Sequence, residues 1–132
     1  MHMMSKKGWE VHYASMGEEE ILDCDKSFVV SFTRSPFRLS NITAYRQLKK
    51  IINQENYDII HTHTPMGSVV TRLAAKKARK NGTKIIYTAH GFHFFKGAPL
   101  LNWLIYYPVE RLMARHTDTL ITINKEDYHR AK

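Results

Sequence analysis

Residues 57–65 read Tyr-Asp-Ile-Ile-His-Thr-His-Thr-Pro, an apolar run followed by two histidines and the start of a helix. Thr64 is a good helix cap, and Pro65 suits the first helical position, where the missing N–H costs nothing. Residues 84–93, Lys-Ile-Ile-Tyr-Thr-Ala-His-Gly-Phe-His, contain a second apolar run that also ends in histidines. In open α/β sheets, ligands bind outside the carboxyl ends of the strands. The two segments therefore predict one polar site at neighbouring strand ends.

The rest of the chain continues the alternation of strands and helices. Extended runs predict strands at residues 11–15, 28–32, 59–61, 84–88 and 120–123. Apolar residues at helical spacing predict helices at 41–53, 65–80 and 99–115, with Ser40 capping the first and Pro108 kinking or dividing the last. We also expect a helix tail at 5–8, an acidic loop at 18–20 and a capped helix beginning near Asn124 and Asp127. This order predicts one α/β domain over residues 1–132, with a doubly wound, mostly parallel sheet and helices on both faces.

The composition fits a single domain without disulfides. The chain has 132 residues, of which 43% are apolar and 24% charged, enough for one core and too few for two. Its single cysteine, Cys24, excludes an internal disulfide and fits a reducing compartment. No apolar stretch is long enough to span a bilayer, and residues 1–7 lack the apolar centre of a secretory signal. We therefore expect a cytoplasmic protein that has access to the inner face of the membrane.

The net charge of +8 favours anionic partners. Six basic residues follow one another without an intervening acid: Arg72, Lys76, Lys77, Arg79, Lys80 and Lys84. We interpret most of them as a solvated helix face. Nucleic-acid modules usually add aromatic residues or a recognisable motif to such charge, and this run has neither. We therefore expect no nucleic-acid partner, which leaves phosphorylated small molecules and acidic lipid.

The two histidine segments leave two kinds of chemistry open. His61, His63, His90 and His93 together form a candidate zinc site, so a zinc hydrolase is one alternative function. No carboxylate stands at ligand spacing beside them, so we expect no metal there and hydrogen-bonding histidines instead. The helix start at Thr64 offers the other chemistry, because its free N–H groups and the helix dipole favour an anion. Glycine at position 67 would let a phosphate or a sugar hydroxyl approach.

Residues 92–107 are unusually aromatic and apolar for a loop and a helix. Core packing accounts for part of this pattern. A second interpretation is a surface at the lipid headgroups, where Trp and Tyr are favoured and where Lys96, Arg111 and Arg115 would attract anionic lipid. A third is burial against another domain.

Four segments occur in a characteristic order: 61–67 (His-Thr-His-Thr-Pro-Met-Gly), 87–93 (Tyr-Thr-Ala-His-Gly-Phe-His), 107–112 (Tyr-Pro-Val-Glu-Arg-Leu) and 117–127 (Thr-Asp-Thr-Leu-Ile-Thr-Ile-Asn-Lys-Glu-Asp). Together they resemble the N-terminal domain of family 4 glycosyltransferases with the GT-B fold. The most similar members are bacterial enzymes of capsular and exopolysaccharide synthesis. The resemblance extends over nearly the whole chain and implies a Rossmann-like domain.

The resemblance also implies a division of labour. Such enzymes face two Rossmann-like domains across a cleft, need no metal or cofactor and retain the anomeric configuration. The C-terminal domain holds the nucleotide-sugar donor, and the N-terminal domain holds a saccharide or lipid-phosphate-linked acceptor. On this basis His90 is the candidate catalytic residue, near the donor sugar and phosphates. The expected substrate-binding residues are His61, His63, Thr64, Gly67, Gly91, His93 and Lys96.

Two parts of that family pattern do not occur within these 132 residues. The family's first strand with its glycine-rich loop would precede residue 5, and the C-terminal domain would follow the last helix. We therefore expect a truncated GT-B domain that is inactive alone and self-associates through an exposed strand edge. A stand-alone binding or scaffold module remains the principal alternative.

Overall fold

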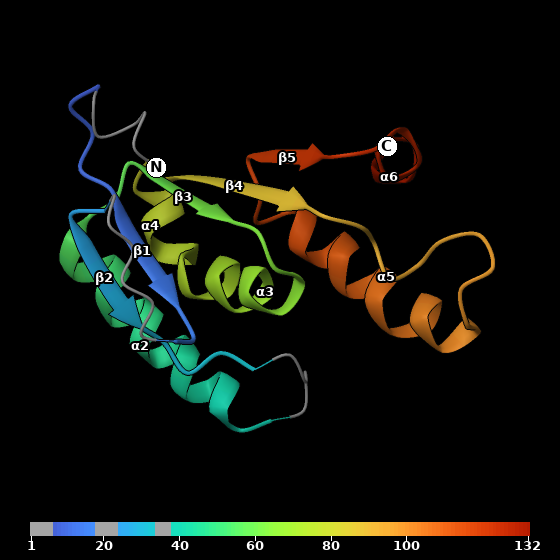
Figure 1. Cartoon of the computed structure of the whole chain (residues 1–132), viewed down its shortest axis with the longest axis horizontal. Helices are drawn as coiled ribbons and strands as arrows, with labels where there is room; N and C mark the ends of the chain where they lie inside the picture. The colour runs from blue at the N-terminus through green and yellow to red at the C-terminus, as the bar shows by residue number, and fades with distance from the viewer. Residues whose placement is uncertain (1–6, 18–23, 34–37) are drawn as a thin grey trace.

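The computed structural model describes residues 7–17, 24–33 and 38–132 (Figure 1). Strands alternate with helices along the chain: β1 His12–Ser15, β2 Lys26–Val29, α2 Ser40–Glu55, β3 Ile59–Thr62, α3 Pro65–Ala74, α4 Lys76–Lys80, β4 Lys84–Ala89, α5 Leu100–Ala114, β5 Thr119–Thr122 and α6 Lys125–Ala131. The predicted α/β class is confirmed. The predicted acidic loop at 18–20 and the start of the predicted helix tail at 5–8 lie outside the described residues, and Lys7 and Gly8 form a turn.

Every strand pairing among the described residues is parallel, as predicted. β1 pairs with β2, and β4 lies between β3 and β5. The prediction of one sheet is wrong for this part of the chain, because the strands form a two-stranded and a three-stranded sheet (Figure 1). β1 and β3 each leave one edge unpaired among the described strands, so no backbone ladder joins the two sheets.

The core lies where α2 and α3 pack against each other and against the sheets. It contains buried residues from β4, both helices and the end of β2: Val30, Ala44, Leu48, Ile52, Val70, Ala74, Ala75 and Ile85. Besides Ile85, β4 supplies three more buried residues, because a central strand is covered on both sides. Burial fixes the position of β4, and the parallel pairing with β4 fixes β3, so the segments that follow both strands start from a defined place.

Several boundaries differ from the sequence-based expectation. The second strand begins and ends earlier than predicted, and the buried Val30 donates its N–H to the Ser15 carbonyl just beyond it. Ser40 does not cap α2, because the helix already includes it and Leu39 stands at the cap position. The helix predicted at 65–80 is interrupted at Ala75, whose ψ of 0° is not helical.

α5 is one helix although it contains Pro108, which we expected to kink or divide it. Proline removes one backbone donor and opens a gap in the helical ladder. Of its fifteen residues only Met113 is buried. No helix among the described residues has the length and apolarity needed to cross a bilayer.

Candidate functional site

Three of the four predicted histidines meet at the carboxyl ends of β3 and β4. His61 lies on β3, His63 follows that strand, and His90 follows β4 directly. The ring centroids of His61 and His63 are 4.2 Å apart, and those of His63 and His90 are 5.8 Å apart. The parallel register aligns Thr62 with Tyr87, which brings the two strand ends side by side. We call His61, His63 and His90 the histidine cluster.

Hydrogen bonds with side-chain hydroxyl groups hold His61 and the neighbouring Thr62 in place on β3. His61 Nε2 is 2.8 Å from the hydroxyl of Thr88 on β4, which fixes the plane of the imidazole. Thr62, next to His61, points the other way and donates to the buried hydroxyl of Ser68 at 2.9 Å. Two adjacent strands and the first turn of α3 therefore position the cluster through side-chain hydrogen bonds.

The environment disfavours the protonated form of two of these imidazoles. Burial lowers the pKa of His61, and the neighbouring His63 lowers it further. Burial and the nearby His90 likewise lower the pKa of His63. A neutral imidazole has one donor and one acceptor nitrogen, so each ring can bind a hydroxyl group in either direction. The cluster is therefore suited to hydroxyl-rich ligands at neutral pH.

The depressed pKa values predict that the fold loses stability as the pH falls. In the unfolded chain these histidines take up protons near their ordinary pKa of 6.5, whereas the folded chain does so only at lower pH. The stabilising contribution is complete above pH 6.5 and is lost below it, down to the folded-state pKa values. Urea unfolding at pH 7.5 and pH 5.5 measures this loss. The double variant His61→Asn/His63→Asn should show a smaller difference between the two pH values, and an equal difference would contradict the prediction.

The predicted anion-binding turn lies beside the cluster. Thr64 is the cap residue of α3 and Pro65 its first residue, as predicted, although the Thr64 side chain makes no capping hydrogen bond. A Cβ on Gly67 would lie 2.5 Å from the Thr64 hydroxyl, so a side chain at position 67 would displace it. Gly91 has a φ of +135°, a backbone conformation that favours glycine where the chain turns away from β4.

The other two predicted site residues lie apart from the cluster. The ring of His93 packs against Tyr106 on α5, with 4.7 Å between the centroids, and its carbonyl accepts a hydrogen bond from Asn102. Lys96 is exposed in the loop before α5. Because ring contacts join only three of the four histidines in the described structure, the four-histidine zinc site is not assembled.

Sequence reasoning missed buried polar residues on the elements that carry the site. Arg72 was grouped with a solvated basic face, yet its side chain is 1% exposed. Its guanidinium lies over the Tyr87 ring at 4.5 Å and donates to Glu110 at 3.1 Å and to Thr117 at 3.3 Å. In the sequence, the helical period places Arg72 three residues after the apolar Val69, and this spacing could have indicated that Arg72 faces the core.

Asp127 is a second residue of this kind. Its buried carboxylate accepts the Phe92 N–H at 3.4 Å and so joins α6 to the loop that follows His90. Asn124 caps α6 by accepting the Asp127 N–H at 2.7 Å, which confirms the predicted helix start. The capping pattern predicted the start of α6, but it did not predict the contact of Asp127 with the loop at 91–92.

Comparison with known proteins agrees with the resemblance seen in the motifs. The family model described as glycosyl transferase 4-like matches residues 1–124. A Bacillus subtilis (strain 168) protein named "Putative glycosyltransferase EpsD" is 58% identical over 125 residues, which is 95% of this chain and 33% of the relative. An Escherichia coli protein named UDP-Gal:alpha-D-GlcNAc-diphosphoundecaprenol alpha-1,3-galactosyltransferase is 30% identical over 76% of this chain and 25% of its own length.

A third relative has no assigned activity. An uncharacterised 41.2 kDa protein from the cps region of Klebsiella pneumoniae is 27% identical over 74% of this chain and 28% of its own length. The chain thus spans about a third or less of each of these relatives. Because the family model covers nearly every residue, from the first to the helix cap at Asn124, the chain belongs to the glycosyl transferase 4-like family.

Proposed function

We propose that this chain forms the acceptor-side wall of a glycosyltransferase that moves a sugar from a nucleotide-sugar donor to a saccharide or lipid-phosphate-linked acceptor. The observation that carries the proposal is the histidine cluster at the ends of β3 and β4, beside the start of α3, in a chain of this family. The Escherichia coli relative is named for a UDP-linked donor and a diphosphoundecaprenol-linked acceptor, which supports this substrate class.

The histidines of the cluster have two different roles in this proposal. His90 is exposed beyond β4 and acts toward the donor, where it donates a hydrogen bond to a sugar hydroxyl or to the departing phosphate. His61 and His63 act toward the acceptor, because hydroxyl groups suit their neutral rings. Thr64, Gly67 and the N–H groups of α3 lie close enough to bind an anionic part of either substrate. Gly91, His93 and Lys96 line the same side of the domain in this proposal.

The resemblance to the family implies that this step needs no metal or cofactor. Positioned donors that stabilise developing charge on a phosphate leaving group supply the chemistry. The donor contacts belong to another domain in this proposal, so we expect this chain alone to be inactive. The family match favours a transferase over a stand-alone scaffold or a zinc hydrolase.

A chimera tests the proposed function directly. This chain replaces the matching third of the Bacillus subtilis relative, to which it is 58% identical. The expected result is transfer of radiolabelled sugar from a nucleotide-sugar to an undecaprenyl-diphosphate-linked acceptor, with none by this chain alone. A folded chimera that transfers no sugar, while the relative itself does, would contradict the proposal and favour a binding module.

We further propose that α5 contacts the surface of an anionic membrane. Its exposed residues recur at spacings of four and seven and so share one face of the helix. Apolar side chains lie toward the start of that face and basic ones toward its end, and we call it the α5 face: Leu100, Leu104, Tyr107, Arg111 and Arg115, the last just beyond the helix. An exposed apolar face with cations along it favours a headgroup region over bulk water. This placement would bring a lipid-linked acceptor to the histidine cluster from the cytoplasmic side.

Substitutions on the α5 face should abolish membrane binding. Leu100→Glu/Leu104→Glu adds two negative charges to the face, and co-sedimentation with phosphatidylglycerol vesicles is expected to fall to background. Val109→Glu is the matched control, since Val109 is also part-exposed on α5 but lies on another face. Vesicles of phosphatidylcholine should bind the wild-type chain weakly, because they lack the anionic headgroup. Equal loss in the Val109 variant, or equal binding to both vesicles, would argue against the α5 face.

The unpaired edges of β1 and β3 lead us to propose self-association of this chain. Unpaired strand edges bind other strands, and β3 carries the exposed apolar residue Ile59. Light scattering behind a size-exclusion column is expected to show a mass above 15.5 kDa that rises with concentration. A monomer at every concentration would refute this proposal.

A further inference from the structure

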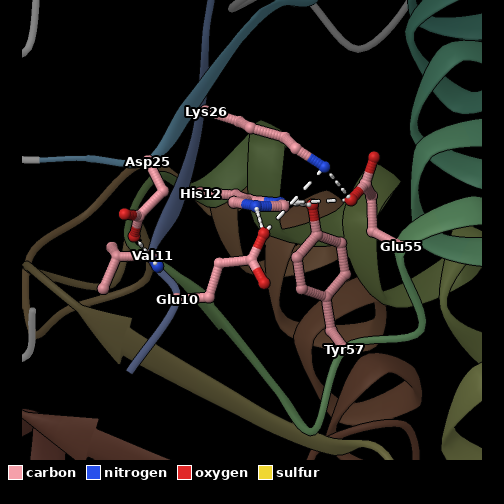
Figure 2. Close-up of polar contacts among 7 residues, drawn as sticks. All are labelled: Glu10, Val11, His12, Asp25, Lys26, Glu55 and Tyr57. Atoms are coloured by element: carbon pink, nitrogen blue, oxygen red, sulfur yellow. Dashed lines mark hydrogen bonds and ion pairs between the residues drawn. The ribbon is translucent and has the colours of Figure 1, made fainter. Parts of the chain in front are cut away.

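Figure 2 shows a second group of ionisable side chains, which lies near the start of β1 and the end of α2, whereas the histidine cluster lies at the carboxyl ends of β3 and β4. Glu10 precedes β1, His12 is the first residue of β1, and Glu55 ends α2. One nitrogen or oxygen of each lies within 4.8 Å of the others. We call these residues the Glu-His-Glu group.

The two carboxylates approach different nitrogens of the His12 ring, so the Glu55 carboxylate has to turn toward Nε2 for all three side chains to bind one ion. His12 Nε2 is 2.8 Å from a carboxylate oxygen of Glu10, and His12 Nδ1 is 3.8 Å from one of Glu55. Divalent transition cations bind imidazole and carboxylate ligands at about 2.0–2.2 Å, so their ligand atoms stand about 3–3.6 Å apart. Glu10 is 67% exposed and can move by the required ångström without disturbing the core. The His12 ring is 6% exposed and supplies the fixed point.

A cation already occupies the space between the two carboxylates. The ammonium of Lys26 lies 2.7 Å from Glu55 and 3.9 Å from Glu10. Its side chain is 49% exposed, so it can withdraw into water at little cost. Two carboxylates face this single ammonium, so one negative charge among these three groups is uncompensated. This charge favours exchange of the ammonium for a doubly charged ion.

Tyr57 holds the imidazole in the orientation that such an ion needs. Its hydroxyl lies 2.7 Å from His12 Nδ1, and burial raises its pKa to about 12, so the phenol stays neutral. When the ring proton is on Nδ1 and donates to the phenol oxygen, the lone pair of Nε2 faces Glu10. Ligand histidines in metal sites are commonly held by a hydrogen bond to the second ring nitrogen.

We propose that Glu10, His12 and Glu55 bind a divalent transition cation of the Zn²⁺ class, in competition with the ammonium of Lys26. The ion would tie β1 to the end of α2 and the chain entering β3, across the gap where no strand ladder joins the two sheets. Its role is structural, since it lies near the start of β1 and the end of α2, whereas the histidine cluster lies at the carboxyl ends of β3 and β4.

Binding of Zn²⁺ by calorimetry and thermal unfolding tests this site. Every variant is made in a His61→Ala/His63→Ala/His90→Ala background, without a histidine tag, so that the histidine cluster does not compete. With Zn²⁺ at about ten times its dissociation constant, the midpoint of unfolding is expected to rise by about 5 °C. Glu55→Gln is expected to weaken binding at least about tenfold. Lys26→Met is expected to strengthen it about fivefold, because a unit charge about 4 Å away is removed.

Lys50→Met is the matched control, since it removes the same charge from an exposed position on α2. The gain expected for Lys26→Met keeps the test meaningful even if Glu55→Gln unfolds the chain. Unchanged affinity in both Lys26→Met and Glu55→Gln, equal gains in the two lysine variants, or no Zn²⁺ binding in the background chain would each overturn the proposal.

Discussion

His90→Ala in the chimera is expected to lower kcat for sugar transfer by about 10²- to 10³-fold, the usual effect of removing one donor that stabilises a developing anion. His90 follows β4 directly, and β4 is the central strand of its sheet. Deleting its imidazole therefore removes a hydrogen-bond donor from a fixed place while the strand beneath stays packed. The effect should fall on kcat more than on KM, because the interaction strengthens as charge develops on the departing phosphate.

His129→Ala is the matched control for this experiment. His129 is an exposed histidine on α6, outside the histidine cluster, so transfer should stay within about twofold of the parent chimera. Steady-state kinetics with radiolabelled donor give kcat and KM separately. Undiminished transfer, or a change in KM alone, would contradict the proposed role, since either result would mean that His90 does not stabilise the transition state.

Glu110→Ala is expected to destabilise the fold by about 3–5 kcal/mol, because it leaves the Arg72 guanidinium buried without its counter-charge. The Arg72 side chain is 1% exposed and that of Glu110 is 16% exposed, and 3.1 Å separates the paired atoms. The Arg72 guanidinium also lies over the ring of Tyr87 on the central strand β4. Removing Glu110 as its partner is therefore expected to disturb that strand as well. The free energy of unfolding in urea measures the change.

Two further variants separate the buried pair from a general charge effect. Glu126 pairs with Arg130 at an exposed position on α6, so Glu126→Ala is expected to cost only about 0.3–0.5 kcal/mol. The double variant Arg72→Met/Glu110→Leu should recover most of the stability, because apolar side chains of similar volume need no counter-charge. A Glu110→Ala variant as stable as Glu126→Ala would show that the Arg72 pair does not stabilise the domain.

The fold was largely predictable because its signals are local. The run at 59–60 ends where His61 begins the polar segment, and Thr64-Pro65 starts a helix by cap chemistry alone. Asn124 likewise caps α6 as expected. The helix-boundary errors fell at Ser40 and at Ala75, where packing around α2 and α3 set the boundaries instead of local propensity. The single sheet and the bounds of the second strand were also wrong, because strand pairing depends on contacts between distant segments.

The candidate site was predictable only in part. The alternation of strands and helices was enough to place His61, His63 and His90 at neighbouring strand ends, because parallel strands in one sheet end on the same side. The sequence gives no direction for a loop side chain, and His93 turned toward Tyr106 instead. The roles of these residues in transfer stay predictions.

By itself the sequence determined the order of the elements, the parallel strands and the two histidine-bearing strand ends, because hydrophobic period and capping act over a few neighbouring residues. Only the tertiary structure decided which charges are buried and which partners meet. Arg72 reads as part of a basic helix face, yet Glu110, 38 positions away, makes it a buried ion pair. Glu10, His12 and Glu55 carry no sequence signal as a group, because β1 and the end of α2 approach each other only when the helix packs on the sheets.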